Sequence, residues 1–495
     1  MKARDGLYLA VGAAVMLVPA ALALAVFPTA MIDTRELFAW GRHFPLVTHK
    51  HPPLMALIGG LVETVLPPDA FSAILVGQIL NAVGVLYLYL TLLMVVARDR
   101  ARLFAFLFAT SLYFQLAPLS YALNADILQV PIWLAIVYHL IRAARSNSLS
   151  HWLALAAWVA AAFLTKYTAG LLILAGVAAT LAVPEFRGIW RNPRLYLAAV
   201  CAVLLVTPHL LALRTNSAAL TYAEQFTLAD RGVSGRLAGI VQFIGGTLLF
   251  LAPGWIVIAA GFLNGNCTLA GRDDDPDRRA TVHFVQVLAV ATVAILLVMT
   301  LTLGTLLNHR YGAPLFGLFV LALAPLVAVN PATWSRAEPG IIAIAGVVAG
   351  VVFLASVVVY GFFTSHNYMQ EPTGEAAAIM RAEWNRHFTC GPGYYLGDRP
   401  SAHGLALAGD RHPVGMPLED IPLAHWYKPA LLQREGAIVA FRTPIPADIV
   451  RQSFPDAEIA EQPSFTLPLL RTFSGATITY HYFFIPPQSC TIAAQ

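Results

Sequence analysis

The sequence predicts an α-helical polytopic membrane protein with about eleven transmembrane helices and a small C-terminal α/β domain. Three observations predict this fold. Hydrophobic residues make up 58% of the 495 residues and charged residues only 12%, whereas soluble proteins carry roughly 25% charged residues. Apolar runs of membrane-spanning length recur as far as Phe363. Residues 364–495 then contain many Pro, Gly, Asp, Arg and His residues and no spanning run.

The first apolar run, residues 7–30, is longer than the hydrophobic region of a signal peptide, so we expect a retained transmembrane helix. The shorter run 54–67 ends in Pro67-Pro68, and we expect it to lie along the interface or to re-enter the membrane. The other expected spans are 71–97, 103–117, 126–142, 152–166, 168–183, 195–213, 237–262, 283–303, 311–329 and 340–363.

Lys and Arg set the expected orientation, because they are retained preferentially on the cytoplasmic side. The cytoplasmic connections carry more of them than the outer loops when the N-terminus is placed in the cytoplasm. An odd number of spans then puts residues 364–495 on the outer face. In this outer domain we expect a helix over Glu375–His387 and strands over Ala437–Phe441 and Thr477–Ile485. Residues 1–363 form the predicted transmembrane domain.

Four cysteines divide between the two predicted domains. Cys201 lies in a span and Cys267 in a predicted cytoplasmic loop, whereas Cys390 and Cys490 lie in the outer domain. Disulfides persist outside the cytoplasm, so we predict that Cys390 pairs with Cys490; two free thiols are the alternative. The sequence has no zinc-type Cys/His spacing, no P-loop and no dinucleotide-binding glycine pattern.

Polar residues gather on the predicted outer face, where the first loop (residues 31–70) follows the first span. Charged groups near membrane depth are candidates for function, although any one of them alone is explained by helix capping or by snorkelling to the interface. Their concentration on one face favours a functional site. The residues concerned are Asp33, Glu36, Lys50 and His51 in the first loop, Asn124 and Asp126 before a later span, Lys166 and Tyr167, and His309, Arg310 and Tyr311.

The order of these motifs resembles the polyprenol-phosphate-sugar-dependent glycosyltransferases of the GT-C type. The nearest group is the superfamily of protein O-mannosyltransferases and lipid A aminoarabinose transferases (bacterial family 39 like). The resemblance rests on Asp33, on His-Pro-Pro-Leu closing the first loop, on Asp126, on Thr-Lys-Tyr around Lys166 and on His-Arg-Tyr around Arg310. The segment YYLGDRPSAHGLALAGDRHPVGM is similar to an outer-domain segment of bacterial members.

One departure concerns the first loop. Many members carry adjacent Asp-Glu, but here Thr34 follows Asp33 and the nearest glutamate is Glu36. The assignment of Asp33 as the base survives this difference. A paired role for Glu36 as a second carboxylate, including metal binding, stays open, so a divalent metal is possible and no cofactor is certain.

The resemblance implies an inverting transfer of a sugar from a polyprenyl phosphate to an acceptor hydroxyl, with Asp33 as general base. Arg310 is the first choice for the donor phosphate and Lys166 and Lys50 the next, because cations stabilise the departing anion. His51 positions phosphate or acceptor, or caps the helix behind Pro52. Asp126 supports the site or binds a sugar hydroxyl, or caps the later span.

The implied location is the bacterial inner membrane, with the active site and the outer domain in the periplasm. The acceptor is the lipid A or lipopolysaccharide core, another glycan, a lipid or a protein, and no nucleic-acid partner is expected. The alternative function is a transporter or flippase for a lipid-linked sugar, which would place charged or broken helices near the bilayer midplane, often in repeats. The polar residues lie at one face and no repeat is evident, which favours an enzyme. A membrane scaffold whose outer domain binds a partner would leave Asp33 and Arg310 unexplained.

Overall fold

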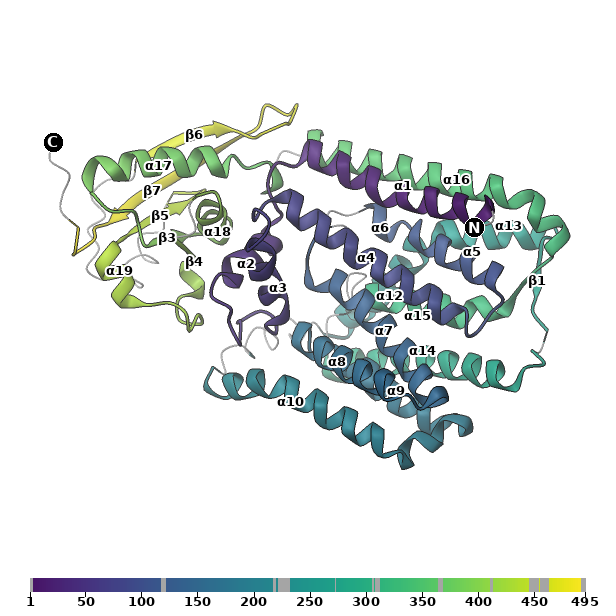
Figure 1. Ribbon diagram of the computed structural model, residues 1–495. Coiled ribbons are helices and arrows are strands. Elements are labelled where there is room, and N and C mark those ends of the chain that lie inside the picture. The colour runs from purple at the N-terminus through teal and green to yellow at the C-terminus, as the bar shows by residue number, and fades with distance from the viewer. Residues whose placement is uncertain are drawn as a thin grey trace.

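The computed structural model describes residues 3–116, 122–216, 220, 232–271, 273–304, 307, 312–363, 368–409, 413–444, 454 and 463–490. A long bundle of helices occupies one part of the molecule and a mixed sheet with three helices the other, with two short helices between them (Figure 1). The N-terminus lies at the end of the bundle away from the sheet domain.

The bundle is organised around α7 (Ala125–Ser146), whose apolar window is 72% buried and which packs against α4, α8 and α15. Its ends follow from the sequence. The side chain of Asn124 caps the N-terminus, and Asn147 closes the C-terminus in the left-handed conformation. The other bundle helices are α1 (Ala3–Val26), α4 (Ala70–Leu92), α5 (Arg98–Ala109), α6 (Tyr113–Leu116), α8 (Leu149–Thr165), α9 (Ala169–Ala182), α10 (Pro193–Thr215), α12 (Gly232–Phe250), α13 (Ala252–Leu263), α14 (Pro276–Leu303), α15 (Ala313–Leu323) and α16 (Pro331–Val358).

Fewer helices than predicted are long and apolar enough to span a membrane. In the described part of the chain six helices meet that test, or seven if α9 and the bent 3₁₀ segment Pro184–Arg191 form one span. The multi-span bundle is therefore confirmed, and the described residues support six or seven of the approximately eleven predicted spans. The expected span 103–117 is divided between α5 and α6, the span 237–262 breaks at Leu251 into α12 and α13, and 311–329 contains the eleven-residue α15. The short apolar helices α5 and α15 are largely buried among their neighbours, whereas most of α13 is not buried, so the hydropathy of a short helix reports protein contacts as well as lipid.

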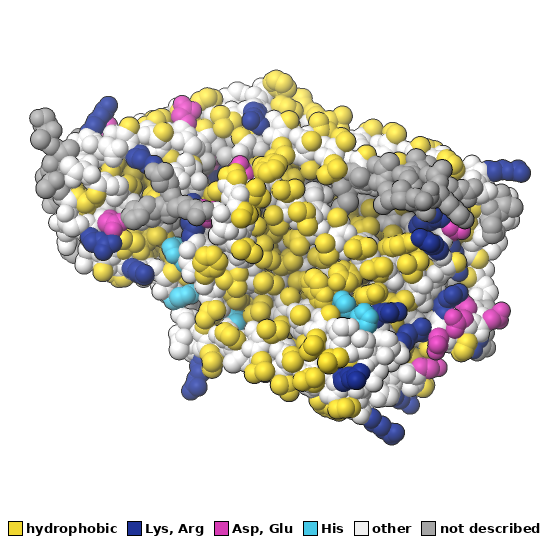
Figure 2. Space-filling model, viewed as in Figure 1, with side chains coloured by type: hydrophobic (Ala, Val, Ile, Leu, Met, Phe, Trp, Pro, Cys, Tyr) yellow, Lys and Arg dark blue, Asp and Glu magenta, His cyan; other side chains and the backbone are white. Residues whose placement is uncertain are grey.

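The surface supports a multi-pass membrane protein. Figure 2 shows hydrophobic side chains over the middle of the bundle, with Lys and Arg gathered at the end away from the sheet domain. Such a continuous apolar surface is far larger than a soluble monomer exposes. Exposed members of the apolar surface include Leu204, Leu211, Val241, Ile244, Ile256 and Val290.

The short helices α2 (Ile32–Gly41) and α3 (Leu54–Glu63) lie between the bundle and the sheet domain (Figure 1). With ten residues, α3 is too short to span, in line with the expectation for residues 54–67. The two helices approach very closely where Gly41 meets Gly60, because a Cβ on Gly60 would lie only 2.2 Å from the carbonyl oxygen of Gly41. Glycine at this crossing therefore sets the position of α2.

The C-terminal domain is built on a five-stranded mixed sheet of order β4-β3-β5-β7-β6. The β3–β4 and β3–β5 pairs are parallel, and the β5–β7 and β6–β7 pairs are antiparallel. The structure contains the predicted helix, extended to Thr373, and both predicted strands. The elements are α17 (Thr373–His387), β3 (Tyr394–Gly397), α18 (Arg399–Leu407), β4 (Val414–Pro417), α19 (Pro429–Glu435), β5 (Ala437–Phe441), β6 (Ser464–Pro468) and β7 (Thr477–Ile485).

A disulfide joins Cys390 to Cys490, as the sequence predicts, and ties the C-terminal segment to the loop after α17. Cys201 and Cys267 are free thiols. A second, two-stranded antiparallel sheet pairs β1 (Cys267–Leu269) with β2 (Val327–Val329) between bundle helices.

Candidate active site

Helix α2 presents the two carboxylates of the first outer loop. Residues Thr34 to Gly41 are buried, so the helix is fixed by packing along most of its length. The hydroxyl of Thr34 donates to the carbonyl oxygen of Leu123 at 2.8 Å, which ties α2 to the segment before α7. Asp33 lies in the first turn with 39% of its side chain exposed, whereas the side chain of Glu36 is only 2% exposed. The two carboxylates therefore lie in different environments: Asp33 is accessible and Glu36 is enclosed.

A cavity of about 50 Å³ opens beside Asp33 and Glu36. It brings together residues from the first outer loop, the start of α7 and the end of α8, which lie far apart in the sequence. Its walls contain the charged candidates Asp33, Glu36, Lys50, Asp126 and Lys166 that the sequence predicted. The remaining candidate, Arg310, lies outside the described residues. The lining residues are Asp33, Glu36, Leu37, Lys50, His51, Asn124, Ala125, Asp126 and Lys166.

Lys50 joins the two carboxylates of α2. Its Nζ atom lies 2.7 Å from Oδ1 of Asp33 and 2.8 Å from Oε2 of Glu36. Burial by itself lowers the pKa of Lys50, but the charges of Glu36 and Asp33 outweigh burial, so the pKa is raised above its usual value. Lys50 is therefore a fixed cation at the floor of the site.

Asp126 and Lys166 form the second ion pair of the cavity, with Nζ of Lys166 2.6 Å from Oδ1 of Asp126. The sequence left open whether Asp126 caps α7. In the structure, Asn124 is the cap, since its side-chain oxygen accepts hydrogen bonds from the backbone N–H groups of Asp126 and Ile127. The carboxylate of Asp126 is thus committed to Lys166 and the cavity, not to the helix end.

His51 lines the cavity as a neutral group. Burial lowers its pKa to about 3, and the nearby cations Lys166 and Lys50 lower it further. It does not cap the helix behind Pro52-Pro53, because the N-cap of α3 is Pro53. A neutral imidazole can donate one hydrogen bond and accept another. His51 is therefore better suited to contact a polar group of the substrate than to bind phosphate as a cation.

The arrangement of the cavity carboxylates also bears on whether a metal binds there. Within the described residues, no group of three or more His, Cys, Asp or Glu side chains is arranged to hold a metal ion. Asp33 and Glu36 both face Lys50, so the ammonium group stands where a cation shared by these carboxylates would lie. The described residues therefore do not fit a divalent metal bound by this pair.

The sequence analysis missed the contribution of the sheet domain. Arg399 of α18 lies 2.8 Å from Oε1 of Glu36, and Asp420 lies 3.1 Å from Nε2 of His49. The only signal was that Arg399 belongs to the segment whose likeness to bacterial members was noted. Nothing in the linear sequence links that segment to a carboxylate 363 residues earlier.

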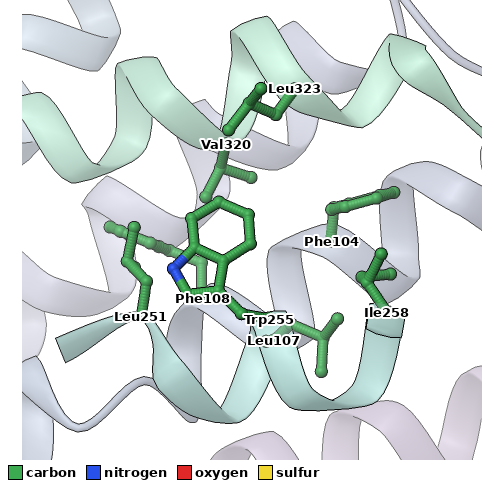
Figure 3. Close-up of a pocket in the computed structure, with 9 residues that line it drawn as sticks. Phe104, Leu107, Phe108, Leu251, Trp255, Ile258, Val320 and Leu323 are labelled. Atoms are coloured by element: carbon green, nitrogen blue, oxygen red, sulfur yellow. The ribbon is translucent and has the colours of Figure 1, made fainter. Parts of the chain in front are cut away.

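A second, apolar pocket lies among α5, α13 and α15, where Trp255 and Phe108 face Val320 and Leu323 (Figure 3). Its water-sized space is about 30 Å³, and its walls are hydrocarbon apart from the indole N–H of Trp255. Such walls have no charged or titratable group for acid–base chemistry, so the charged cavity is the candidate active site.

Comparison with known proteins agrees with this geometry. Residues 50–211 match the family described as dolichyl-phosphate-mannose-protein mannosyltransferase. That stretch includes six of the nine cavity residues, which are Lys50, His51, Asn124, Ala125, Asp126 and Lys166. This stretch of the chain, about a third of its length, is therefore similar to a family of glycosyltransferases. Comparison with proteins of curated function gives no match.

The fold of the chain is similar to that of ArnT from Cupriavidus metallidurans. The structure of ArnT bound to undecaprenyl phosphate superposes with a TM-score of 0.62 at 14% identity, covering 97% of this chain and 98% of ArnT. The structure of ArnT in the apo state gives the same values. The oligosaccharyltransferase AglB from Archaeoglobus fulgidus, in complex with an inhibitory peptide and a dolichol-phosphate, is less similar, with a TM-score of 0.42 at 10% identity, over 82% of this chain and 64% of AglB.

Proposed function

We propose that this protein is a glycosyltransferase that moves a sugar from a polyprenyl-phosphate donor to an acceptor hydroxyl at the periplasmic face of the bacterial inner membrane. The observation that carries the proposal is the cavity in which three carboxylates and two ammonium groups from three distant segments converge. The match of residues 50–211 to a family named for a dolichyl-phosphate-linked donor, and the fold shared with an undecaprenyl-phosphate-binding protein, support the class of donor.

Asp33 is the general base of the proposed reaction. The acceptor oxygen attacks the anomeric carbon, the bond from that carbon to the phosphate oxygen breaks, and Asp33 takes the hydroxyl proton. A single displacement of this kind inverts the anomeric configuration. Asp33 suits the role because it is the more exposed carboxylate of α2 and lines the cavity, while Glu36 is enclosed. Glu36 instead fixes Lys50.

The polyprenyl phosphate leaves with increased negative charge, which preplaced cations stabilise. Lys50 and Lys166 face the cavity, yet each already has a carboxylate partner. The lining holds three carboxylates against these two ammonium groups, so an incoming phosphate needs a further cation or a shift of one lysine towards it. Arg310 fills that need in the proposal, as a guanidinium binds phosphate oxygens with two hydrogen bonds. Asp126 then orients Lys166, and His51 contacts sugar or acceptor.

The test compares purified full-length wild type with Asp33→Asn, using labelled polyprenyl-phosphate sugars and a panel of lipid, glycan and peptide acceptors. Loss of the base is expected to lower the transfer rate about 10²- to 10⁴-fold. Asp69→Asn is the matched control, because Asp69 caps α4 through its bond to the backbone N–H of Ser72 and asparagine caps equally well.

Three outcomes decide between the readings. Loss of transfer in Asp33→Asn with retention in Asp69→Asn supports the base role, and an inverted product supports single displacement. Unchanged transfer in Asp33→Asn removes Asp33 from that role. Movement of the lipid-linked sugar across vesicles without transfer would favour the flippase instead.

A further inference from the structure

The charged network of the cavity continues into the sheet domain through Glu36. One carboxylate oxygen, Oε2, accepts from Lys50 at 2.8 Å, and the other, Oε1, accepts from Nη1 of Arg399 at 2.8 Å. Glu36 is 1% exposed. A buried carboxylate thus holds one cation from the first outer loop and one from the sheet domain, and it has little access to water that would replace either.

Arg399 is itself firmly held at the start of α18. Its Nη2 atom lies 2.7 Å from Oε1 of Glu419 and 2.9 Å from Oδ1 of Asp420. The helix is fixed at this end because the carboxylate of Asp398 accepts from the backbone N–H of Ser401. Since α18 packs directly against α2, the guanidinium reaches Glu36 from a rigid element.

The network then returns to the first loop. Oδ1 of Asp420, which is also buried, lies 3.1 Å from Nε2 of His49, the residue before Lys50. This separation is close enough for an ion pair although the ring is not aligned for a hydrogen bond. The sheet domain therefore contacts the first loop at two places, Glu36 and His49.

The consequence of removing Arg399 follows from charge. Taking one partner from a buried ion pair leaves an uncompensated charge, which is strongly unfavourable. Both oxygens of Glu36 would then compete for Lys50, the remaining cation within reach among the described contacts of that carboxylate. Lys50 would be drawn from Asp33 and from the cavity towards Glu36. Arg399 prevents this by occupying Oε1.

We propose that Arg399 is a positioning residue for sugar transfer, holding Glu36 and, through it, the Lys50 ammonium at the cavity. The proposal rests on the function proposed above, and it makes the sheet domain part of the active-site assembly although none of its residues lines the cavity.

Simple docking of the domain has a separate basis in the structure. Arg35 of α2 pairs with Glu371 at 2.8 Å, and Glu371 also pairs with Arg442 at 3.1 Å. Arg35 and Glu371 are about as buried as Glu36, but they do not line the cavity. Glu371→Gln therefore serves as a matched control, since it weakens the junction between the two domains without touching Glu36 or Lys50.

The experiment uses full-length protein in lipid nanodiscs and measures kcat, KM and unfolding temperature for wild type, Arg399→Gln, Arg399→Lys, Glu36→Gln and the double variant Glu36→Gln/Arg399→Gln. We expect Arg399→Gln to lower kcat about 10- to 100-fold with little change in acceptor KM, since displacement by about 1 Å costs that much. Arg399→Lys retains more activity because it keeps a charge opposite Glu36. The double variant is no slower than Glu36→Gln alone, because Arg399 acts through Glu36. Glu371→Gln lowers the unfolding temperature but leaves kcat within about threefold of wild type.

Two results would overturn the proposal: a folded Arg399→Gln protein with wild-type kcat, or losses from positions 36 and 399 that multiply in the double variant. Failure of the proposed function looks different, since wild type itself would then transfer no sugar. In that case the unfolding temperatures of wild type, Glu36→Gln, Arg399→Gln and the double variant still report whether positions 36 and 399 are coupled. Absence of coupling would contradict the contact between these two residues.

Discussion

The crossing of α2 and α3 offers a test of how far the active site depends on backbone position. Adding one methyl group in Gly60→Ala would place a Cβ 2.2 Å from the carbonyl oxygen of Gly41. An ordinary contact begins near 3.4 Å, so the two helices must separate by roughly 1 Å. The added Cβ is attached directly to the backbone of α3, and the oxygen belongs to the backbone of α2, so no flexible side chain can move aside.

Two effects of opposite sign must be compared. Alanine in a helix interior is favoured over glycine by about 0.5–1 kcal/mol. Overpacking a buried contact costs typically about 1–3 kcal/mol, and a backbone-to-backbone clash belongs at the upper end. We therefore expect net destabilisation of about 2–2.5 kcal/mol. Because α2 carries Asp33 and Glu36, a shift of this size should also lower kcat by up to about 10²-fold.

The assay is the transfer rate of Gly60→Ala together with its unfolding temperature. Gly176→Ala is the control, since Gly176 lies inside α9 and a Cβ there would meet nothing within 4 Å; this variant should be as stable as wild type or slightly more so, with unchanged kcat. Wild-type stability and wild-type kcat in Gly60→Ala would refute the reasoning, because α2 would then tolerate a displacement that the proposed site cannot.

Two further predictions concern stability. Burial lowers the pKa of His403, in α18, to about 3, below the value of 6.5 for an unfolded chain. Between pH 6.5 and pH 3 the unfolded state therefore binds more protons than the folded state. The free energy of unfolding falls as pH is lowered from about 6.5, by about 2 kcal/mol at pH 5. Unfolding temperatures at pH 7 and pH 5 should differ less in His403→Gln than in wild type, and an equal difference would contradict this assignment. Replacing Cys390 and Cys490 by serine opens a loop of sequence separation 100 and should destabilise the sheet domain by up to about 4.7 kcal/mol in the chain-entropy model. The unfolding temperature should be lower than that of wild type and should no longer change when reductant is added. A variant as stable as the wild type would show that other contacts hold this segment.

Part of the candidate site could be predicted because its signals are local. A charge beside a long apolar run stands out from composition alone, and Asp33, Lys50, Asp126 and Lys166 do converge on one cavity. The pairing among them could not be predicted. Whether Asp126 capped α7 depended on the conformation of the neighbouring Asn124, whose side chain turned out to be the cap. Arg310 lies outside the described residues and stays a prediction from the sequence.

The sequence by itself determined the class of the protein, the outer-domain strands Ala437–Phe441 and Thr477–Ile485, and the pairing of two cysteines. These features follow from hydropathy, β-branched and aromatic composition and compartment, all of which act over short stretches of chain. The tertiary structure alone decided how many apolar helices are long enough to span, because a short helix buried by its neighbours is as hydrophobic as one facing lipid. It also decided that Glu36 is shared between Lys50 and Arg399, because ion pairing depends on distance in space and not on separation along the chain.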